Sequence, residues 1–158
     1  MRATSRKALC AAVCLVFVAA AIGSTAEIKF EKVEYMPPKV EGQKKSANPV
    51  KGHVIFDKEK KVMEFQDTKG QIIVTIPYDK MKSLLYEKTS KPRYAEAILV
   101  SPFFLFSKTK KHFLSIQYTD ANGAGAFCML HMDKGNSTDI VNTAEAETGK
   151  HVERTEER

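Results

Sequence analysis

Turn signals recur through the middle of this chain every eight to twelve residues or so, and this spacing constrains its fold more than any other feature. Charged or glycine-containing turns stand at 58–61, 67–70 and 121–125. The segments between them are short and rich in β-branched and aromatic residues, which suit the pleated surface of a sheet. The pattern predicts an all-β domain of short antiparallel strands.

The individual strands differ in how clearly the sequence marks them. The segments predicted as strands by alternation or apolar content are 52–57, 62–66, 71–76, 112–120 and 126–133. Asn122-Gly123 is a strong signal for a hairpin between the last two. Residues 78–89 fit helical and strand periodicity equally well, and the turn spacing favours a strand. Residues 95–106 are predicted as a strand bent near Ser101-Pro102.

The pattern changes towards the C-terminus, where one helix is predicted over 138–148. Asn136 and Ser137 suit the N-cap, Asp139 suits the helix dipole, and Gly149 suits a left-handed stop. The charged segment 150–158 is expected to be a frayed tail. Asn136-Ser-Thr138 is also a glycosylation acceptor triplet, and helix capping is the preferred interpretation.

The N-terminus has the pattern of a cleavable signal peptide. Three basic residues precede an apolar run from Ala8 to Gly23, and small residues end at Ala26. The run is shorter than the roughly 20 residues that a membrane span needs. Cleavage is therefore predicted after Ala26, with secretion or a periplasmic location. Residues 27–50 are expected to be an N-terminal arm and linker, in which the alternating stretch 27–35 is either an edge strand or an extended arm. Residues 51–149 are expected to be the folded domain.

Removal of the leader changes the charge and the cysteine count. The formal charge of +6 falls to +3 when Arg2, Arg6 and Lys7 leave, since residues 1–26 contain no acid. A mildly basic chain without a basic stripe does not indicate nucleic-acid binding. Cys128 then stands alone, so no internal disulfide is expected, and its apolar surroundings favour burial in the core.

Several stretches together resemble the pleckstrin-homology-like barrel, and in part the GRAM type. The local points are Gly52-His-Val-Ile-Phe56, Val62-Met-Glu-Phe65 and the run from Val74 to Leu85 with its Ile-Pro step. The hairpin at Asn122-Gly123 and the closing helix complete the likeness. The expected fold is thus mainly β, a small antiparallel barrel or strongly bent sheet of six to seven strands with one C-terminal helix.

This resemblance implies a binding domain without catalytic machinery. Family members engage phosphoinositides, peptides or proteins, and lipid-binding members use a basic loop between their first two strands. The matching lysines here are Lys58, Lys60 and Lys61. They flank Glu59, and the arginine that usually follows is missing. Headgroup binding is therefore not expected.

The chain contains no recognisable catalytic, cofactor or metal motif. Its four histidines are His53, His112, His131 and His151, and none is spaced for shared metal ligation. His131 and Cys128 are three apart on a predicted strand and should point to opposite faces. His112 is expected beside Lys111 on a solvated loop. An enzyme, a metal site and a cofactor are not predicted.

One segment combines aromatic and basic residues unusually densely. The candidate surface-binding hairpin consists of Phe103, Phe104, Phe106, Lys108, Lys110 and Lys111, with Phe113 closing the segment. Such a hairpin could insert its rings at a membrane surface or bind a partner. The alternative, which we favour, is two buried strands joined by a charged turn.

These observations predict an exported, non-enzymatic binding module for a protein, a peptide or an envelope surface. No nucleic acid is expected as a partner, and no integral membrane span after leader cleavage. The alternative function is a carrier of a lipid or small apolar ligand in the barrel interior, which would need an empty apolar cavity of roughly 300 Å³ or more.

Overall fold

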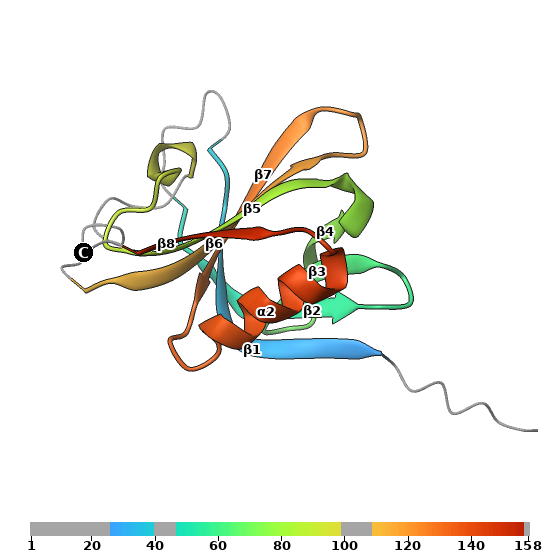
Figure 1. The fold of residues 1–158 in the computed structure, drawn as a ribbon, viewed down its shortest axis with the longest axis horizontal. Helices are drawn as coiled ribbons and strands as arrows, with labels where there is room; N and C mark the ends of the chain where they lie inside the picture. Colours follow the sequence, from blue (N-terminus) through green and yellow to red (C-terminus); the bar gives the residue numbers. More distant parts are fainter. Residues whose placement is uncertain (1–25, 40–46, 99–108, 157–158) are drawn as a thin grey trace, which may run out of the picture.

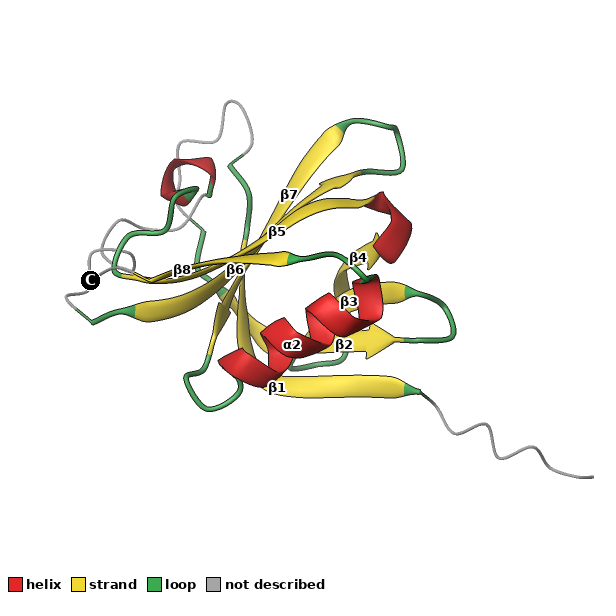
Figure 2. Ribbon diagram, viewed as in Figure 1, coloured by secondary structure: helices red, strands yellow, loops and turns green. Residues whose placement is uncertain are grey.

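The computed structural model describes residues 26–39, 47–98 and 109–156, which form one sheet and one α-helix (Figures 1 and 2). The strands are β1 (Glu27–Met36), β2 (Val50–Asp57), β3 (Val62–Asp67), β4 (Ile72–Pro77), β5 (Met81–Thr89), β6 (Lys111–Thr119), β7 (Gly125–Met132) and β8 (Val152–Glu156). The helix α2 (Ser137–Thr148) lies between β7 and β8, and short 3₁₀ turns occupy Tyr78–Lys80 and Ala95–Ala97.

The eight strands lie in the order β4-β3-β2-β1-β7-β6-β5-β8. All neighbours pair antiparallel except β8, which runs parallel to β5. The sheet is strongly bent, and α2 lies across one side of it (Figure 1). It remains open, with β4 and β8 as its two edges.

The mainly β architecture with a C-terminal helix is confirmed, and of the two predicted forms, a barrel or a strongly bent sheet, the structure has the open, bent sheet. Three details of the prediction are wrong. The sheet has eight strands rather than six or seven, and β8 pairs parallel rather than antiparallel. The segment from Glu27, expected as an edge strand or arm, is the interior strand β1 between β2 and β7. Its alternation allowed a strand, but its neighbours come from distant parts of the chain.

The concave side of the sheet holds the main core. Alternate residues of the strands point inwards, for example Val54 and Phe56 of β2 and Leu114 and Ile116 of β6, and all four are fully buried. The helix closes this side with Ile140, Val141 and Ala144. Burial of each large apolar side chain contributes about 2 kcal/mol, so this layer supplies most of the stability.

A smaller cluster covers the opposite face of β6 and β7. Met36, Ile98, Phe113 and Met129 are buried there against Tyr94 and its neighbours. Phe113 of β6 therefore points away from Leu114 and Ile116, the inward-facing residues of its strand. Residues 95–98, expected to begin a strand, instead form a 3₁₀ turn followed by an isolated bridge from Ile98 to Pro38. Residues 99–106 of that expected strand lie outside the described residues.

Gly52 marks the closest approach between β2 and β3. A Cβ atom built at Gly52 would lie only 1.9 Å from the backbone oxygen of Gln66 and 2.9 Å from the ring of Phe65. The ring of Phe65 belongs to the main core. Only glycine allows this contact, because any side chain would push the two strands apart.

The C-terminal region confirms the helix and corrects the tail. The helix ends where predicted, with Gly149 in the left-handed conformation at φ 65°. The segment expected to fray contains β8, because Val152 is fully buried in the main core and anchors the strand beside β5. The many charged residues of this segment obscured its one buried apolar residue, Val152, in the sequence. Among the described residues, no helix is long and apolar enough to cross a membrane.

Candidate binding site

A hollow opens on the outer face of the sheet where β1 separates from β7. Along β1, pairing with β2 runs from Glu27 to Tyr35, whereas pairing with β7 covers only Val33–Met36. The break coincides with a bulge at which Lys32 has a positive φ of 57°. A bulge bends a strand and redirects its side chains, so the outer surface is hollowed at this point.

The hollow has a volume of about 590 Å³, within the range of small-ligand and peptide-side-chain sites. We call it the bulge pocket. It is lined by Lys29, Glu31, Lys32, Val33, Glu34, Lys51, Gly52, His53, Thr68, His131 and Asp133. These residues come from β1, β2 and β7 and from the turns after β3 and β7. The central strand thus brings together segments that are far apart in the sequence.

Two histidines of the pocket are held by neighbouring side chains. His131 Nδ1 lies 3.0 Å from Glu34 Oε2, and both side chains are about one-fifth exposed. His53 Nε2 lies 3.2 Å from Gln66 Oε1, and the amide of Gln66 donates to Glu64 in turn. These hydrogen bonds orient both imidazoles and fix how they line the pocket.

The charges around the pocket are balanced. The lining contains three lysines and three carboxylates, namely Lys29, Lys32 and Lys51, and Glu31, Glu34 and Asp133. A pocket for a phosphate backbone would carry an excess of positive charge. Mixed charges of both signs instead favour a ligand that presents both a cationic and an anionic group, as a polypeptide does.

The pocket offers little for catalysis within the described residues. Thr68 supplies the sole hydroxyl of the lining, and the two histidines are engaged with Glu34 and Gln66. A nucleophile bonded to its base is the usual starting point for covalent catalysis. Groups of three or more potential metal ligands do not occur in the described parts of the chain either.

The aromatic and basic hairpin predicted from the sequence is only partly described. Phe103, Phe104, Phe106 and Lys108 lie outside the described residues. Of the rest, Lys110 is exposed. Lys111 is the first residue of β6 and is half-buried. Burial lowers the pKa of its amine, and the negative charge of Glu34 partly offsets this by raising it.

Phe113 is fully buried in the smaller cluster and packs against His131, with the ring centroids 5.4 Å apart. Within the described end of this segment, Phe113 therefore points into the protein, whereas Lys110 is exposed. Surface binding by the hairpin stays a prediction.

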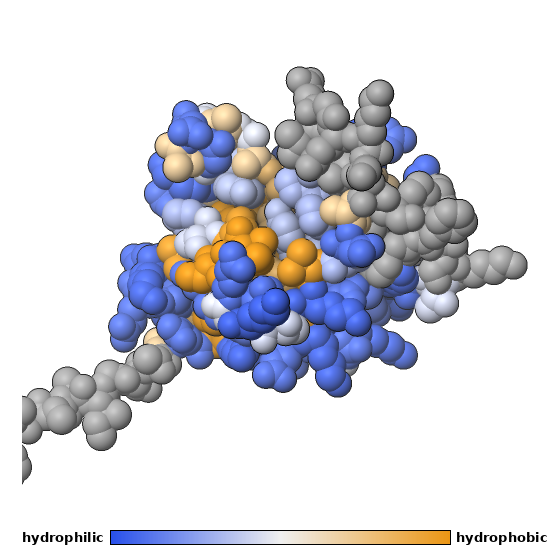
Figure 3. All heavy atoms as spheres, turned by 180° about the vertical axis from the view of Figure 1, so that it is seen from behind, coloured by the Kyte–Doolittle hydropathy of each residue, from blue (hydrophilic) through white to orange (hydrophobic). Residues whose placement is uncertain are grey.

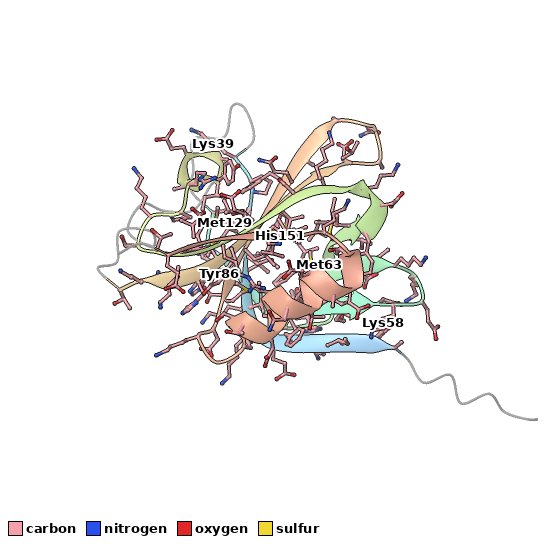
Figure 4. All side chains as sticks on the ribbon, in the orientation of Figure 1. Lys39, Lys58, Met63, Tyr86, Met129 and His151 are labelled. Carbon is pink, nitrogen blue, oxygen red and sulfur yellow. The ribbon has the colours of Figure 1, made fainter. Side chains whose placement is uncertain are left out.

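The basic loop between β2 and β3 is engaged in contacts of its own. Lys60 Nζ lies 2.8 Å from Asp57, and Lys58 Nζ lies 2.9 Å from Glu147 of α2. Lys58, labelled in Figure 4, thus ties the loop to the helix. Headgroup binding by these lysines, which the sequence already disfavoured, would have to break both ion pairs.

Cys128 and the histidines fall partly as predicted. Cys128 is fully buried in the main core, and this burial raises the pKa of its thiol to about 12. His131 points to the other face, as the offset along the strand required. His112 is not on a loop, because it lies within β6, 2.7 Å from the hydroxyl of Tyr86 and stacked on that ring.

Asn136 occupies the N-cap position, but its side chain does not cap the helix. Its amide donates instead to the backbone carbonyl of Glu31, which joins the helix start to the bulge of β1. The amide is half-buried and already bonded, so a glycan could attach there only if this contact were broken. The contact also fixes one wall of the bulge pocket.

Sequence reasoning missed the bulge pocket. No glycine marks the bulge, since the residue with positive φ is Lys32. The lining is spread over the chain from Lys29 to Asp133, and no local motif connects its parts. The one available signal was the interrupted alternation of β1, in which Phe30 and Val33 both point towards the core.

Fold and site together define a class, a mainly β domain built on one open, bent sheet with a helix on its concave side and a charged pocket on its outer face. Sequence comparisons do not narrow this class: no protein-family model and no curated protein matches the chain.

Proposed function

We propose that this chain is an exported, non-enzymatic binding module, and that the bulge pocket is its contact site for a polypeptide. The observation that carries the proposal is the pocket itself, a hollow of about 590 Å³ with balanced charge on the central strands. Its walls are set by the pairing of β1 with β2 and, from Val33 onwards, with β7, so the site is preorganised and binding needs little ordering of the protein.

The order of the strands supports the proposed relation to pleckstrin-homology-like domains. The chain runs β1 to β4 on one side of the sheet and β5 to β7 on the other, and β1 joins the two halves. The helix that comes next packs on the concave side. Members of that family are binding modules, which agrees with the proposal, while β8 after the helix is an addition to their layout.

The carrier alternative receives no comparable support. A carrier would hold its apolar ligand on the concave side, where the sheet could enclose it. That side is occupied by fully buried side chains of the sheet, such as Phe56 and Phe65, and by Ile140 of α2. The bulge pocket is lined mainly by charged residues and is unsuited to a lipid chain.

Export remains part of the proposal and rests on the sequence, because residues 1–25 lie outside the described residues. Intact-mass measurement of the protein from its native host should give a chain that begins near Glu27. A full-length mass recovered from the cytoplasm would contradict export. It would leave the pocket proposal untouched.

A comparative pull-down from the extracytoplasmic fraction of the host tests the binding proposal. Lys51→Glu changes the charge of the pocket, whereas Lys82→Glu makes the same change at an exposed site of β5 outside the lining. We expect a polypeptide retained by the wild type and by Lys82→Glu to be lost with Lys51→Glu. Equal retention by both variants would contradict the assignment of the pocket.

A further inference from the structure

The edge strand β4 differs from the surface around it. Gln71 to Pro77 contains no charged residue, and Ile72 and Ile73 are 52% and 38% exposed. They are the exposed large hydrophobic residues of the described chain. Seen from behind, hydrophobic side chains gather in a patch within an otherwise largely hydrophilic surface (Figure 3).

Strand β4 pairs with β3 on one side only. Exposed edges with uncharged, β-branched residues template the addition of another strand, and proteins usually protect them with charge. The protection here is limited to a bulge near Ile73 and to Pro77, which cannot donate to a ladder. Five residues, Ile72 to Ile76, remain suited to pairing.

Space is open beside the second half of β4. Thr75, Pro77 and Lys80 face the end of the β6–β7 hairpin, residues 118–121, across a hollow of about 310 Å³. The hairpin therefore does not pack against this stretch of the edge. This gap could receive side chains from one end of an incoming strand.

We propose that β4 pairs antiparallel with β4 of a second copy of this chain about a two-fold axis at Val74. This inference goes beyond the binding function proposed above and does not depend on it. A two-fold interface uses the same patch on both copies, so the patch must be complementary to itself. The uncharged centre meets this condition, because Ile73 and Thr75 on either side of the axis are both exposed and uncharged, while Ile76 stays buried in the main core.

Charge at the ends of the strand selects this register. With Val74 on the axis, Lys69 in the turn before β4 of one copy and Asp79 in the 3₁₀ turn after β4 of the other lie towards the same end of the paired strands, and this arrangement occurs twice. Both residues are exposed, and neither forms an ion pair within the described part of the chain. A shift of one residue in one direction would bring Lys69 towards Lys80 instead. Like charges in that position disfavour the shifted pairing.

Sedimentation equilibrium of protein purified from cells expressing the whole sequence tests the proposal. A five-residue edge makes a small interface, so the dissociation constant should be micromolar or weaker, and the mass should rise reversibly towards that of a dimer. Ile73→Lys should keep the chain monomeric, because it places a charge in the centre of the contact. The matched control Thr155→Lys alters the other edge strand, β8, and should leave association unchanged.

Charge reversal provides a second test that leaves the apolar centre intact. Lys69→Glu should weaken association about tenfold, since two surface ion pairs become repulsive. The double variant Lys69→Glu with Asp79→Lys should restore it. A wild type that stays monomeric at millimolar concentration would overturn the proposal. The proposal would also be overturned if the Ile73→Lys variant still associated. The same holds if the chain were monomeric and an unrelated polypeptide were bound to β4.

Discussion

The two edges of the sheet are built in opposite ways. Strand β8 ends one side with four charged or polar residues after Val152, and the helix lies beside it. Arg154 bonds to Asn142 and Glu145 of α2, and the backbone amide of Val152 donates to Glu145. Strand β4 ends the other side with exposed isoleucines and has no such cover among the described residues.

This difference shows that a helix adjacent in the chain can protect an edge strand. Glu145 accepts hydrogen bonds from Val152 and Arg154 and pairs with His151, so one carboxylate fastens the helix to β8. Figure 4 labels His151, which precedes β8 in the chain. The edge at β4 lacks an equivalent anchor in the described residues, and we infer that a second copy supplies its cover.

The largest effect is expected from Gly52→Ala, which breaks the half of the sheet that ends in β4. The new methyl group would collide with the backbone of Gln66, and we expect a loss of about 3 kcal/mol in the free energy of unfolding. Gly125→Ala is the control, because a Cβ there meets no atom within 4 Å. Chemical denaturation measures both. Equal stabilities of the two variants would contradict the close approach of β2 and β3.

A smaller effect is expected from Val152→Ala, which acts on the half that ends in β8. The removed methyl groups lie in the main core, so the variant should lose about 2 kcal/mol and β8 should exchange its amide hydrogens faster. Thr155→Ala, on the exposed side of the same strand, should change stability by less than about 0.5 kcal/mol. If both variants behave like the wild type, β8 is not anchored by Val152.

Acid should weaken both halves, through one carboxylate in each. Hydrogen bonds from Lys60 lower the pKa of Asp57, and the hydrogen bond from His151 lowers the pKa of Glu145. The stability that these carboxylates contribute is present above their unfolded pKa values near 4 and is lost as the pH falls through the folded values. The melting temperature should therefore fall steadily from about pH 4 to pH 2.

Asp57→Asn should lower the melting temperature at neutral pH and flatten part of this acid dependence. Glu59→Gln is the control in the same loop, because that exposed side chain forms no ion pair in the described residues. An acid profile of Asp57→Asn that runs parallel to that of the wild type would show that Asp57 contributes nothing through its charge.

The smallest effect is expected at Cys128. Its thiol is buried and its pKa is raised to about 12, so iodoacetamide at pH 8 should modify it only after unfolding. Self-association through β4 should then be unaffected by a reductant. Mass spectrometry under native conditions and in denaturant measures the modification. Rapid native labelling, or a dimer lost on reduction, would place this sulfur at the surface.

Local periodicity predicted much of the fold. The hairpin at Asn122-Gly123, the helix and the burial of Cys128 are found in the structure. A strand within 78–89, which the turn spacing favoured, is found as well, although it begins only at Met81 after a 3₁₀ turn. These features depend on neighbours within a few residues. The central place of β1 depends on pairing with β7, about a hundred residues away, and no pattern within β1 encodes that partner.

The bulge pocket and β8 were hidden for related reasons. The pocket exists because β1 separates from β7 at the bulge around Lys32. The residue with positive φ in this bulge is Lys32, whereas a glycine would have marked the bulge in the sequence. The strand β8 is fixed by one valine in a charged segment, and a single apolar residue gives no periodicity. Both features arise from long-range packing, which outweighs local propensity.

Amide hydrogen exchange at two protein concentrations tests the contrast between the edges most directly. We predict that amides of Ile72 to Ile76 in β4 gain protection as the concentration rises from micromolar to millimolar, because a second strand covers them. The amides of β8 should exchange at the same rate at both concentrations. Protection that rises in β8 instead, or in neither strand, would contradict the proposed difference between the two edges.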